Sequence, residues 1–505
     1  MPAHVNNKAS LPLSLAICSI LFTTLPALAT PLSSVPLTSF TQGDLVISTV
    51  SSFNGGGLDT AAPIVLQQLQ LGAGGTSATL NGSLTLPQTS SGNNSAISGE
   101  YGSASEGILQ RSVNGQYLTI MGYGVNAATF NSAPLSTYGT AALGQTTSLT
   151  AANQTGTPVT TVARVVALIG ANASVDTSTA LTGVFNTNNP RSVVTVDGSS
   201  FYVAGQASSK TDPTQGVFYA IRGATTATAI DTSTDARVVS IFNTGSGNQL
   251  YVSRDQNPPG SGGQNFTNVS SLANASGNLP TSSAGLVSTH ITPPASPLSL
   301  GGNNGSINVT ANTENGINNS RLGSFVYLSP ESYFFASPNV LYVADSGQPK
   351  NGNVDKAALG DGGLQKWELI NNTWTLEYVL YNGLNLVNND ALDLAGNTTT
   401  TPGVTGLLGL TGQVMADGTV ELFATSYGLN ELSPSFLYEI TDNLDFSTVA
   451  QASSESFTTL FAADAGTSIR GVAFAPSSVP EPASLPLVGA ALLALVVSRK
   501  RSQRT

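Results

Sequence analysis

Three pairs of aspartates stand close together in this sequence, and paired carboxylates are the residues that a glycosidase needs. The pairs are Asp231/Asp235, Asp390/Asp393 and Asp442/Asp445. Two carboxylates cleave a glycosidic bond only when they face one cleft at roughly 5–9 Å from each other, and sequence alone does not fix that spacing. Aspartates in surface turns explain the same pattern more simply, so we expect no catalytic residue among them.

The residues required by other catalytic chemistries are scarce. His290 is the only histidine beyond the first 29 residues, and it lies in the segment STHITPPAS, which is typical of an exposed loop. No Gly-x-Ser-x-Gly elbow accompanies it, so a Ser/His/acid triad is not indicated. The single cysteine, Cys18, lies near the start of the chain. A thiolate nucleophile and a zinc site with several His or Cys ligands are therefore excluded from the chain after residue 29.

One segment concentrates the hard oxygen ligands that calcium prefers. Asp345–Asp361 (DSGQPKNGNVDKAALGD) contains Asp345, Asp355 and Asp361 together with asparagines and glycines. Its spacing does not match an EF-hand loop. A solvated turn is the simpler interpretation, with a calcium site at the three aspartates as the alternative. We expect no other cofactor.

The charge of the chain limits its partners. Only 9% of the 505 residues are charged, against about 25% in an average domain. Between residues 30 and 478 there are 12 basic and 27 acidic residues. Such a composition excludes coiled coils and helical bundles, and its acidity argues against binding to nucleic acid.

The elements that must position these residues are β-strands. Runs of about five to eight residues rich in Val, Ile, Tyr, Phe and Thr alternate with clusters of turn-forming residues. Five segments repeat one pattern, a tight turn with Gly, Asn or Asp followed by an apolar strand with an aromatic residue. These segments are Arg111–Gly124, Arg191–Gly205, Asn243–Arg254, Ser337–Gly347 and Gln413–Gly428.

The spacing of these repeats predicts a β-propeller, with tandem β-sandwiches as the alternative. The turns lie near residues 115, 198, 247, 339 and 418, and units of about 40–50 residues would fill these intervals with roughly seven blades. We expect Gly43–Val50 and Arg470–Ala475 in the same or adjacent blades, which would protect the terminal sheet edges. Asn257–Asn318 is expected to be a loop-rich insertion in a body that extends over residues 30–477.

The first 29 residues predict a secretory signal peptide. Lys8 precedes the apolar run Leu11–Leu25, and Ala27-Leu28-Ala29 has the small residues that signal peptidase requires at its cleavage site. Ala27 and Ala29 are the predicted recognition residues. We therefore expect the body to be exported.

The last residues, 478–505, form a second tripartite signal. A short motif precedes the apolar segment Leu485–Val497 and the basic end Arg499–Thr505. The motif residues are Val479, Pro480, Glu481 and Pro482. A helix of thirteen residues spans about 20 Å, less than the ~30 Å hydrocarbon core, so we expect a transient anchor with its basic end in the cytoplasm.

This tail resembles the PEP-CTERM sorting signal of Gram-negative bacteria that make exopolysaccharide. In that family, exosortase recognises and cleaves the Pro-Glu-Pro region. The body resembles secreted β-propeller-like proteins that often carry such tails, and these have no established catalytic residues to transfer. The segments that carry this second resemblance are Ser103–Gly124, Arg191–Gly205, Leu341–Asp345 with Leu364–Trp367, and Arg470–Pro476.

These observations predict an exported, non-enzymatic protein of the cell surface or exopolysaccharide matrix. Its expected partners are an exosortase-type processing enzyme and the matrix polysaccharide, and only the C-terminal segment would contact a membrane. The alternative is a glycosidase-like extracellular hydrolase that acts through carboxylates on a propeller scaffold. Ice or mineral binding would require sustained Thr-x-Thr ladders, which this sequence lacks.

Overall fold

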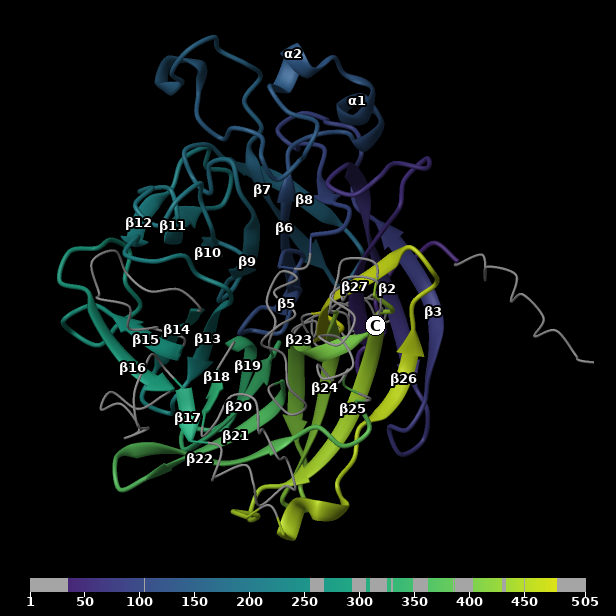
Figure 1. Ribbon diagram of the computed structural model, residues 1–505, viewed down its shortest axis with the longest axis vertical. Coiled ribbons are helices and arrows are strands. Elements are labelled where there is room, and N and C mark those ends of the chain that lie inside the picture. Colours follow the sequence, from purple (N-terminus) through teal and green to yellow (C-terminus); the bar gives the residue numbers. More distant parts are fainter. Residues whose placement is uncertain are drawn as a thin grey trace, which may run out of the picture. The chain divides into compact units, whose positions relative to one another are not determined.

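Figure 1 shows the computed structural model, in which β-strands dominate. The structure describes residues 35–103, 105–254, 268–292, 306–308, 325–327, 330–347, 362–384, 386, 403–428, 433–448 and 450–478. Its helical elements are short and comprise α1 (Ala127–Ser132), α2 (Leu135–Tyr138) and the 3-10 turns Ala151–Asn153 and Gln451–Ser454. Within these ranges no helix has the length and apolar character needed to span a membrane. The all-β prediction is confirmed.

Four separate four-stranded antiparallel sheets follow one another along the chain. The first contains β9 (Pro190–Val194), β10 (Ser200–Gly205), β11 (Gly216–Ile221) and β12 (Thr228–Asp231). The second contains β13 (Val239–Asn243), β14 (Asn248–Arg254), β15 (Asn268–Ala273) and β16 (Val287–Thr292). The third contains β19 (Pro330–Ser337), β20 (Val340–Asp345), β21 (Gly363–Ile370) and β22 (Thr373–Leu380). The fourth contains β23 (Val404–Val414), β24 (Thr419–Gly428), β25 (Phe436–Asn443) and β26 (Thr458–Ala462).

A nine-stranded sheet supplies two further groups of four strands. One group is β27 (Thr467–Phe474), β1 (Leu45–Ser51), β2 (Ala61–Leu71) and β3 (Ala78–Thr85). The other is β5 (Gln110–Arg111), β6 (Tyr117–Tyr123), β7 (Arg164–Gly170) and β8 (Val175–Leu181), which β4 (Ser98–Glu100) links to the first. A separate pair, β17 (Ser306–Asn308) and β18 (Phe325–Tyr327), makes a small ribbon.

The six groups are arranged as the blades of a propeller, and we number them along the chain. Blade 1 contains β27 and β1 to β3, blade 2 contains β5 to β8, and blade 3 contains β9 to β12. Blade 4 contains β13 to β16, blade 5 contains β19 to β22, and blade 6 contains β23 to β26. Successive residues of a strand point to opposite faces, so each blade can pack on both of its neighbours. In β10, Phe201 and Val203 pack on blade 2, whereas Tyr202 and Ala204 pack on blade 4. In the same way, the apolar clusters of the core lie between consecutive blades, including one that joins blade 6 to blade 1.

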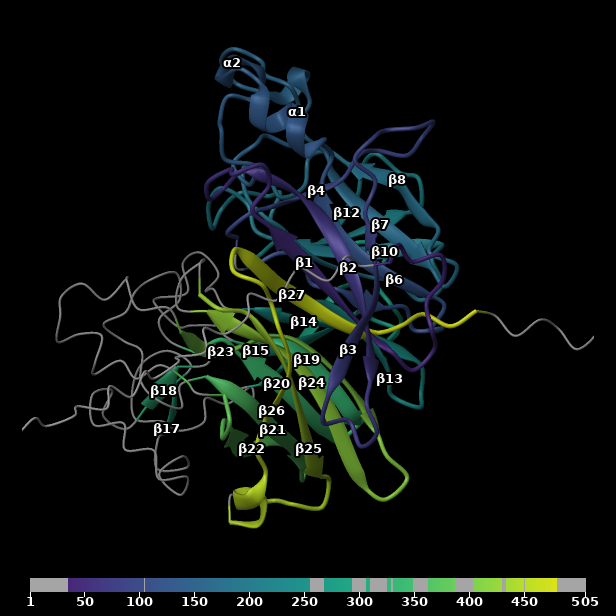
Figure 2. The ribbon, with the colours of Figure 1, turned by 90° about the vertical axis from the view of Figure 1, so that its right-hand side faces the viewer.

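The two ends of the described body meet in blade 1. β27 pairs antiparallel with β1, and Leu45 lies opposite Phe474 while Val50 lies opposite Ser468. Figure 2 shows the late strand β27 beside the early strand β1. The predicted meeting of Gly43–Val50 with Arg470–Ala475 is confirmed, and it places β1 between β27 and β2, so that β1 is not an open sheet edge.

The five sequence repeats are the hairpins that join the first strand of a blade to its second strand in blades 2 to 6. Gly198 and Gly418 occupy the tight turns with φ of 83° and 88°, which favour glycine. The prediction of roughly seven blades is not confirmed, because successive repeats belong to successive blades and the described residues between them form no further four-stranded blade. Asn257–Asn318, the predicted loop-rich insertion, contains β15 and β16, the two outer strands of blade 4.

Buried hydroxyl groups connect each of four blades to the next. Ser48 Oγ donates to the Gly107 carbonyl at 2.6 Å, and Thr119 Oγ1 donates to the Val193 carbonyl at 2.8 Å. Two more bonds of this kind run from Ser253 Oγ to the Glu331 carbonyl at 2.6 Å and from Thr425 Oγ1 to the Arg470 carbonyl at 2.8 Å. All four donors lie on the second strand of a blade and are almost fully buried. Serine and threonine therefore stabilise the ring itself as well as its surface.

Candidate functional site

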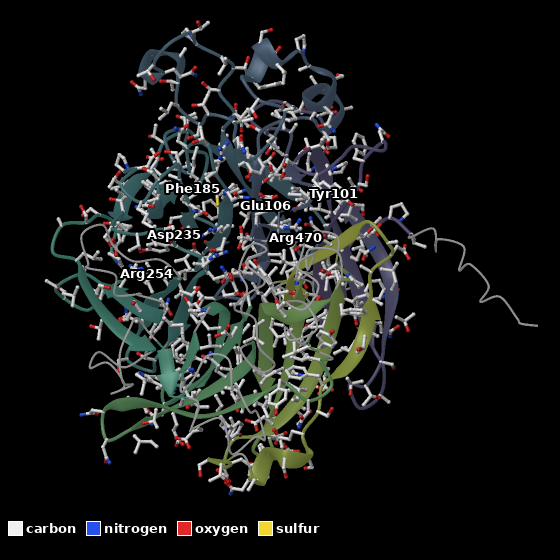
Figure 3. The ribbon with its side chains drawn as sticks, in the orientation of Figure 1. Tyr101, Glu106, Phe185, Asp235, Arg254 and Arg470 are labelled. Carbon is white, nitrogen blue, oxygen red and sulfur yellow. The ribbon has the colours of Figure 1, made fainter. Side chains whose placement is uncertain are left out.

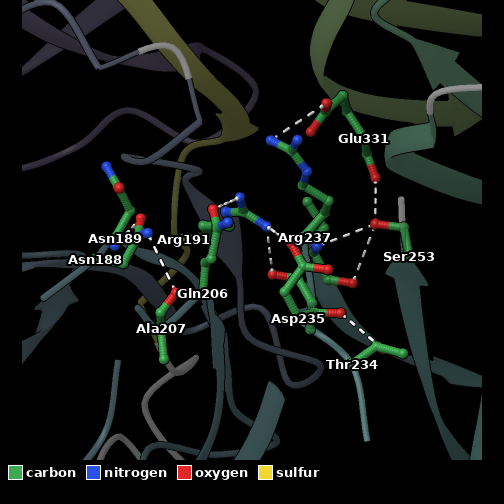
Figure 4. Close-up of polar contacts among 12 residues, drawn as sticks. Asn188, Asn189, Arg191, Gln206, Ala207, Thr234, Asp235, Arg237, Ser253 and Glu331 are labelled. Carbon is green, nitrogen blue, oxygen red and sulfur yellow. Dashed lines mark hydrogen bonds and ion pairs between the residues drawn. The ribbon is translucent and has the colours of Figure 1, made fainter. Parts of the chain in front are cut away.

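Asp231 and Asp235, the first predicted carboxylate pair, are divided between two arginines. Asp235 is fully buried and accepts from Arg191 Nη1 at 2.8 Å, which joins blade 3 to the start of blade 4 (Figure 4). Asp231 forms an ion pair with Arg254. Burial would raise the pKa of Asp231, but Arg254 and the Ser233 hydrogen bonds outweigh it and hold that pKa below its usual value.

A similar pair joins blade 4 to blade 5. Arg237 Nη1 lies 3.6 Å from Glu331 Oε1, and both side chains are buried (Figure 4). The backbone carbonyl of Glu331 also accepts from Ser253 Oγ. Charge and hydroxyl contacts therefore converge on the same blade junction.

Asp442, of the pair Asp442/Asp445, anchors a buried cluster between blades 5 and 6. Lys366 Nζ lies 3.0 Å from Asp442 Oδ2, and neither side chain is exposed. Asp442 also accepts from the hydroxyl groups of Tyr342 and Tyr378. Asp445 is exposed, so the two carboxylates do not share an environment.

The calcium candidate is described only at Asp345. Its buried carboxylate accepts from Gln365 Nε2 at 2.6 Å and from the Gly347 amide at 2.8 Å. Asp355 and Asp361 lie outside the described residues. In the part of the chain that is described, no three His, Cys, Asp or Glu side chains are grouped closely enough to hold a metal ion.

Several other predicted residues cannot be placed. Asp390 and Asp393, Ala27 and Ala29, Val479 to Pro482 and the apolar segment 485–497 all lie outside the described residues. His290 lies in β16 and its backbone pairs with Ser270 in β15, so this residue belongs to a strand and not to the predicted loop. Its side chain is not among those described.

A carboxylate pair that the sequence did not reveal lies where blades 1, 2 and 3 meet. Glu100 is in β4, Glu106 lies just before β5, and both are more than nine-tenths buried. Asn189 Nδ2 lies 3.4 Å from Glu100 Oε2 and 3.2 Å from Glu106 Oε2, so one amide bridges the two acids. Glu106 also accepts from the Glu100 amide at 2.6 Å and from the Tyr123 hydroxyl at 2.9 Å.

Arginines provide the positive charge around this pair. Arg470, on β27, attracts both acids and donates to the Glu100 carbonyl at 3.5 Å; Figure 3 labels it near Glu106. Arg164 lies over the Tyr123 ring at 4.8 Å and donates to backbone carbonyl groups, including that of Phe185.

Burial is the main cause of a raised pKa at both acids. Burial, followed by the charge of Glu106, raises the pKa of Glu100 to about 8. Burial also raises the pKa of Glu106, although Arg470 and the hydrogen bonds to Glu106 oppose that change. Both acids therefore hold a proton more tightly than an exposed glutamate does, and a raised pKa is a property that a general acid requires.

Sequence spacing gave little warning of this site. Glu100 and Glu106 stand six residues apart in GEYGSASEG, a segment with no other charge, and that concentration was the only available signal. Asn189 and Arg470 reach the site from positions far away in the chain, through the closure of the ring.

The comparisons with known proteins include weak likenesses to solved structures. No family model and no curated protein matches the chain. A GH74 enzyme of Niastella koreensis is 12% identical, with a TM-score of 0.34, over 82% of this chain and 46% of that one. A mutant GH32 beta-fructofuranosidase of Bombyx mori in complex with sucrose is 10% identical, with a TM-score of 0.28, over 68% of this chain and 65% of that one. The chain spans about half the length of the first enzyme.

Proposed function

We propose that this protein is an exported, non-enzymatic β-propeller of the cell surface or exopolysaccharide matrix, sorted through its C-terminal tail. The observation that carries the proposal is that buried acids form ion pairs between neighbouring blades. Asp235, Glu331 and Asp442 each form an ion pair that joins one blade to the next. Acids that are used in this way stabilise a scaffold and are not presented to a substrate.

The sorting part of the proposal rests on the tail. Residues 479–482 (VPEP) and the short apolar segment 485–497 fit a signal that is cleaved after transient insertion in the membrane. The two signals together lead to the outside of the inner membrane. The body has few charges, and we expect its Ser, Thr, Asn and Gly residues to retain it in the surface matrix.

Cell fractionation tests this proposal. The full chain is expressed in a strain with active exosortase, beside a variant with Pro480, Glu481 and Pro482 replaced by alanine. We expect the natural chain in the surface or extracellular fraction without its tail, and the variant in the inner membrane at full length. If the natural chain also stays uncleaved in the inner membrane, the sorting proposal is wrong.

The carboxylate pair Glu100/Glu106 favours a second candidate, an extracellular hydrolase of polysaccharides. Glu100 would act as the acid, because burial raises its pKa to about 8, and Glu106 would be the second carboxyl group of the pair. Release of reducing ends from polysaccharide by the purified protein, and its loss by at least a hundredfold in Glu106→Gln, would establish this activity. Asp417→Asn, at an exposed turn, is the matched control.

A further inference from the structure

A small pocket opens beside Arg470, between the closing strand β27 and blade 6. Its lining includes Ser103, Ser426, Ser435, Ser468 and Arg470. Arg470 and Ser435 are buried, whereas Ser468 is half-buried and Pro434, also at the pocket, is exposed. The pocket therefore has a polar interior and an exposed rim.

Two serines of this pocket accept hydrogen bonds from other groups of the protein. Ser103 Oγ accepts from Asn189 Nδ2 at 2.6 Å, and Ser426 Oγ accepts from the Phe436 amide at 2.9 Å. A hydroxyl oxygen that accepts in this way still has its own proton to donate to another acceptor. Two serines whose hydroxyl groups can donate and the buried residue Arg470 therefore line a single small space.

The size of the pocket limits what can enter it. Its volume is about 30 Å³. One water needs roughly 10–15 Å³ when volume is measured in this way, so the space fits about two oxygen atoms and not a sugar ring. A carboxylate or a sulfate group has oxygens that match a guanidinium and flanking hydroxyl donors.

We propose that this pocket binds the oxyanion group, carboxylate or sulfate, of an acidic saccharide in the surrounding matrix. The inference rests on the proposed matrix function and adds the class of ligand. The saccharide ring would lie outside, against the exposed rim near Pro434, and its charged group would enter toward Arg470.

The neighbouring acids make this binding depend on pH. Glu100, Glu106 and Asp59 interact with one another or with Arg470, and Tyr123 donates to Glu106. Ionisation of Glu100 would add negative charge beside Arg470 and repel an anion. Since burial raises the pKa of Glu100 to about 8, we expect anion affinity to fall as the pH rises from 7 to 9.

Isothermal titration of the purified full-length protein tests the pocket with three probes: sodium glucuronate, sodium sulfate and glucose. We expect binding of at least one anion and none of glucose. Ser426→Ala should weaken anion binding about tenfold, because a hydrogen bond to a charged group is lost. Ser454→Ala, at an exposed serine, is the control and should bind like the natural protein.

Each result decides the proposal. Binding of glucuronate alone or of sulfate alone supports it and identifies the source of the oxyanion. Equal affinity in Ser426→Ala and Ser454→Ala, or no binding of either anion, overturns it. Ser468→Ala provides a second variant if Ser426→Ala does not fold, because Ser468 also lines the pocket and is only half-buried. Normal tail processing without anion binding would overturn the pocket and leave the proposed sorting function intact.

Discussion

Replacement of Lys366 by methionine should cost the protein about 4 kcal/mol of stability. Nζ of Lys366 lies at 3.0 Å from Asp442 and donates to the Tyr378 hydroxyl at 2.9 Å. It also donates to the carbonyl groups of Asn443, Leu444 and Phe446 at 2.8, 3.2 and 2.8 Å. Removal of one partner of a buried ion pair costs about 3–5 kcal/mol, because the other charge stays buried without compensation.

Urea unfolding followed by tryptophan fluorescence suits this measurement. Both tryptophans of the chain, Trp367 and Trp374, lie in the same blade as Lys366, and Trp367 is fully buried. Lys210→Met, at an exposed lysine, is the control and should change stability by less than about 0.5 kcal/mol.

The double variant Lys366→Met with Asp442→Asn separates the ion pair from simple packing. Since it removes both charges, we expect it to be less destabilised than the sum of the two single variants, by about 2 kcal/mol or more. The ion pair would not stabilise the contact between blades 5 and 6 if the changes in free energy of unfolding of the two single variants simply added up in the double variant. The same would follow if Lys366→Met were as stable as Lys210→Met.

Three further predictions concern the buried polar groups. Burial raises the pKa of Glu100 and of Glu455 to about 8, above the unfolded value near 4.5. The folded protein therefore binds more protons than the unfolded chain between these values, and its free energy of unfolding should fall as the pH rises from about 5 to 9. A free energy of unfolding in urea that increased over this range would contradict this prediction. Thr425→Val should cost about 2 kcal/mol in the same assay, because it leaves the Arg470 carbonyl and the Gly409 amide without this hydroxyl, whereas the exposed Thr459→Val should cost little. Glu106→Gln should lower the pKa of Glu100, because a neighbouring negative charge is removed; a carboxyl carbon NMR titration would show this, and an unchanged titration would disprove the coupling.

The sequence predicted the first hairpins of the blades and the closure of the ring better than it predicted the number of blades. Turn glycines such as Gly198 and Gly418 identified the first hairpin of five blades, and the apolar strands near the two ends predicted the closure of the ring. The blade count exceeded what is observed because the connections vary in length. The α1–α2 segment, for example, lies within the loop between β6 and β7 and widens one interval to 83 residues.

The candidate site was harder to predict, because it is made by long-range contacts. Asn189 joins Glu106 across 83 residues, and the Gly471 amide donates to Ser48 Oγ across 423. The burial that raises the pKa of Glu100 depends on this three-dimensional packing, and no local pattern encodes it. Ser48 and Thr425 resemble surface hydroxyl residues in sequence, and only the ring of blades shows that they are buried.

We propose that this propeller resides in the matrix without degrading it. The most direct test incubates the purified body with the exopolysaccharide of a producing strain and measures both retention and polymer length by size-exclusion chromatography with light scattering. We predict that the protein co-elutes with the polymer while the chain-length distribution stays unchanged. A progressive shortening of the polymer that disappears in Glu106→Gln would contradict the claim and identify a hydrolase instead.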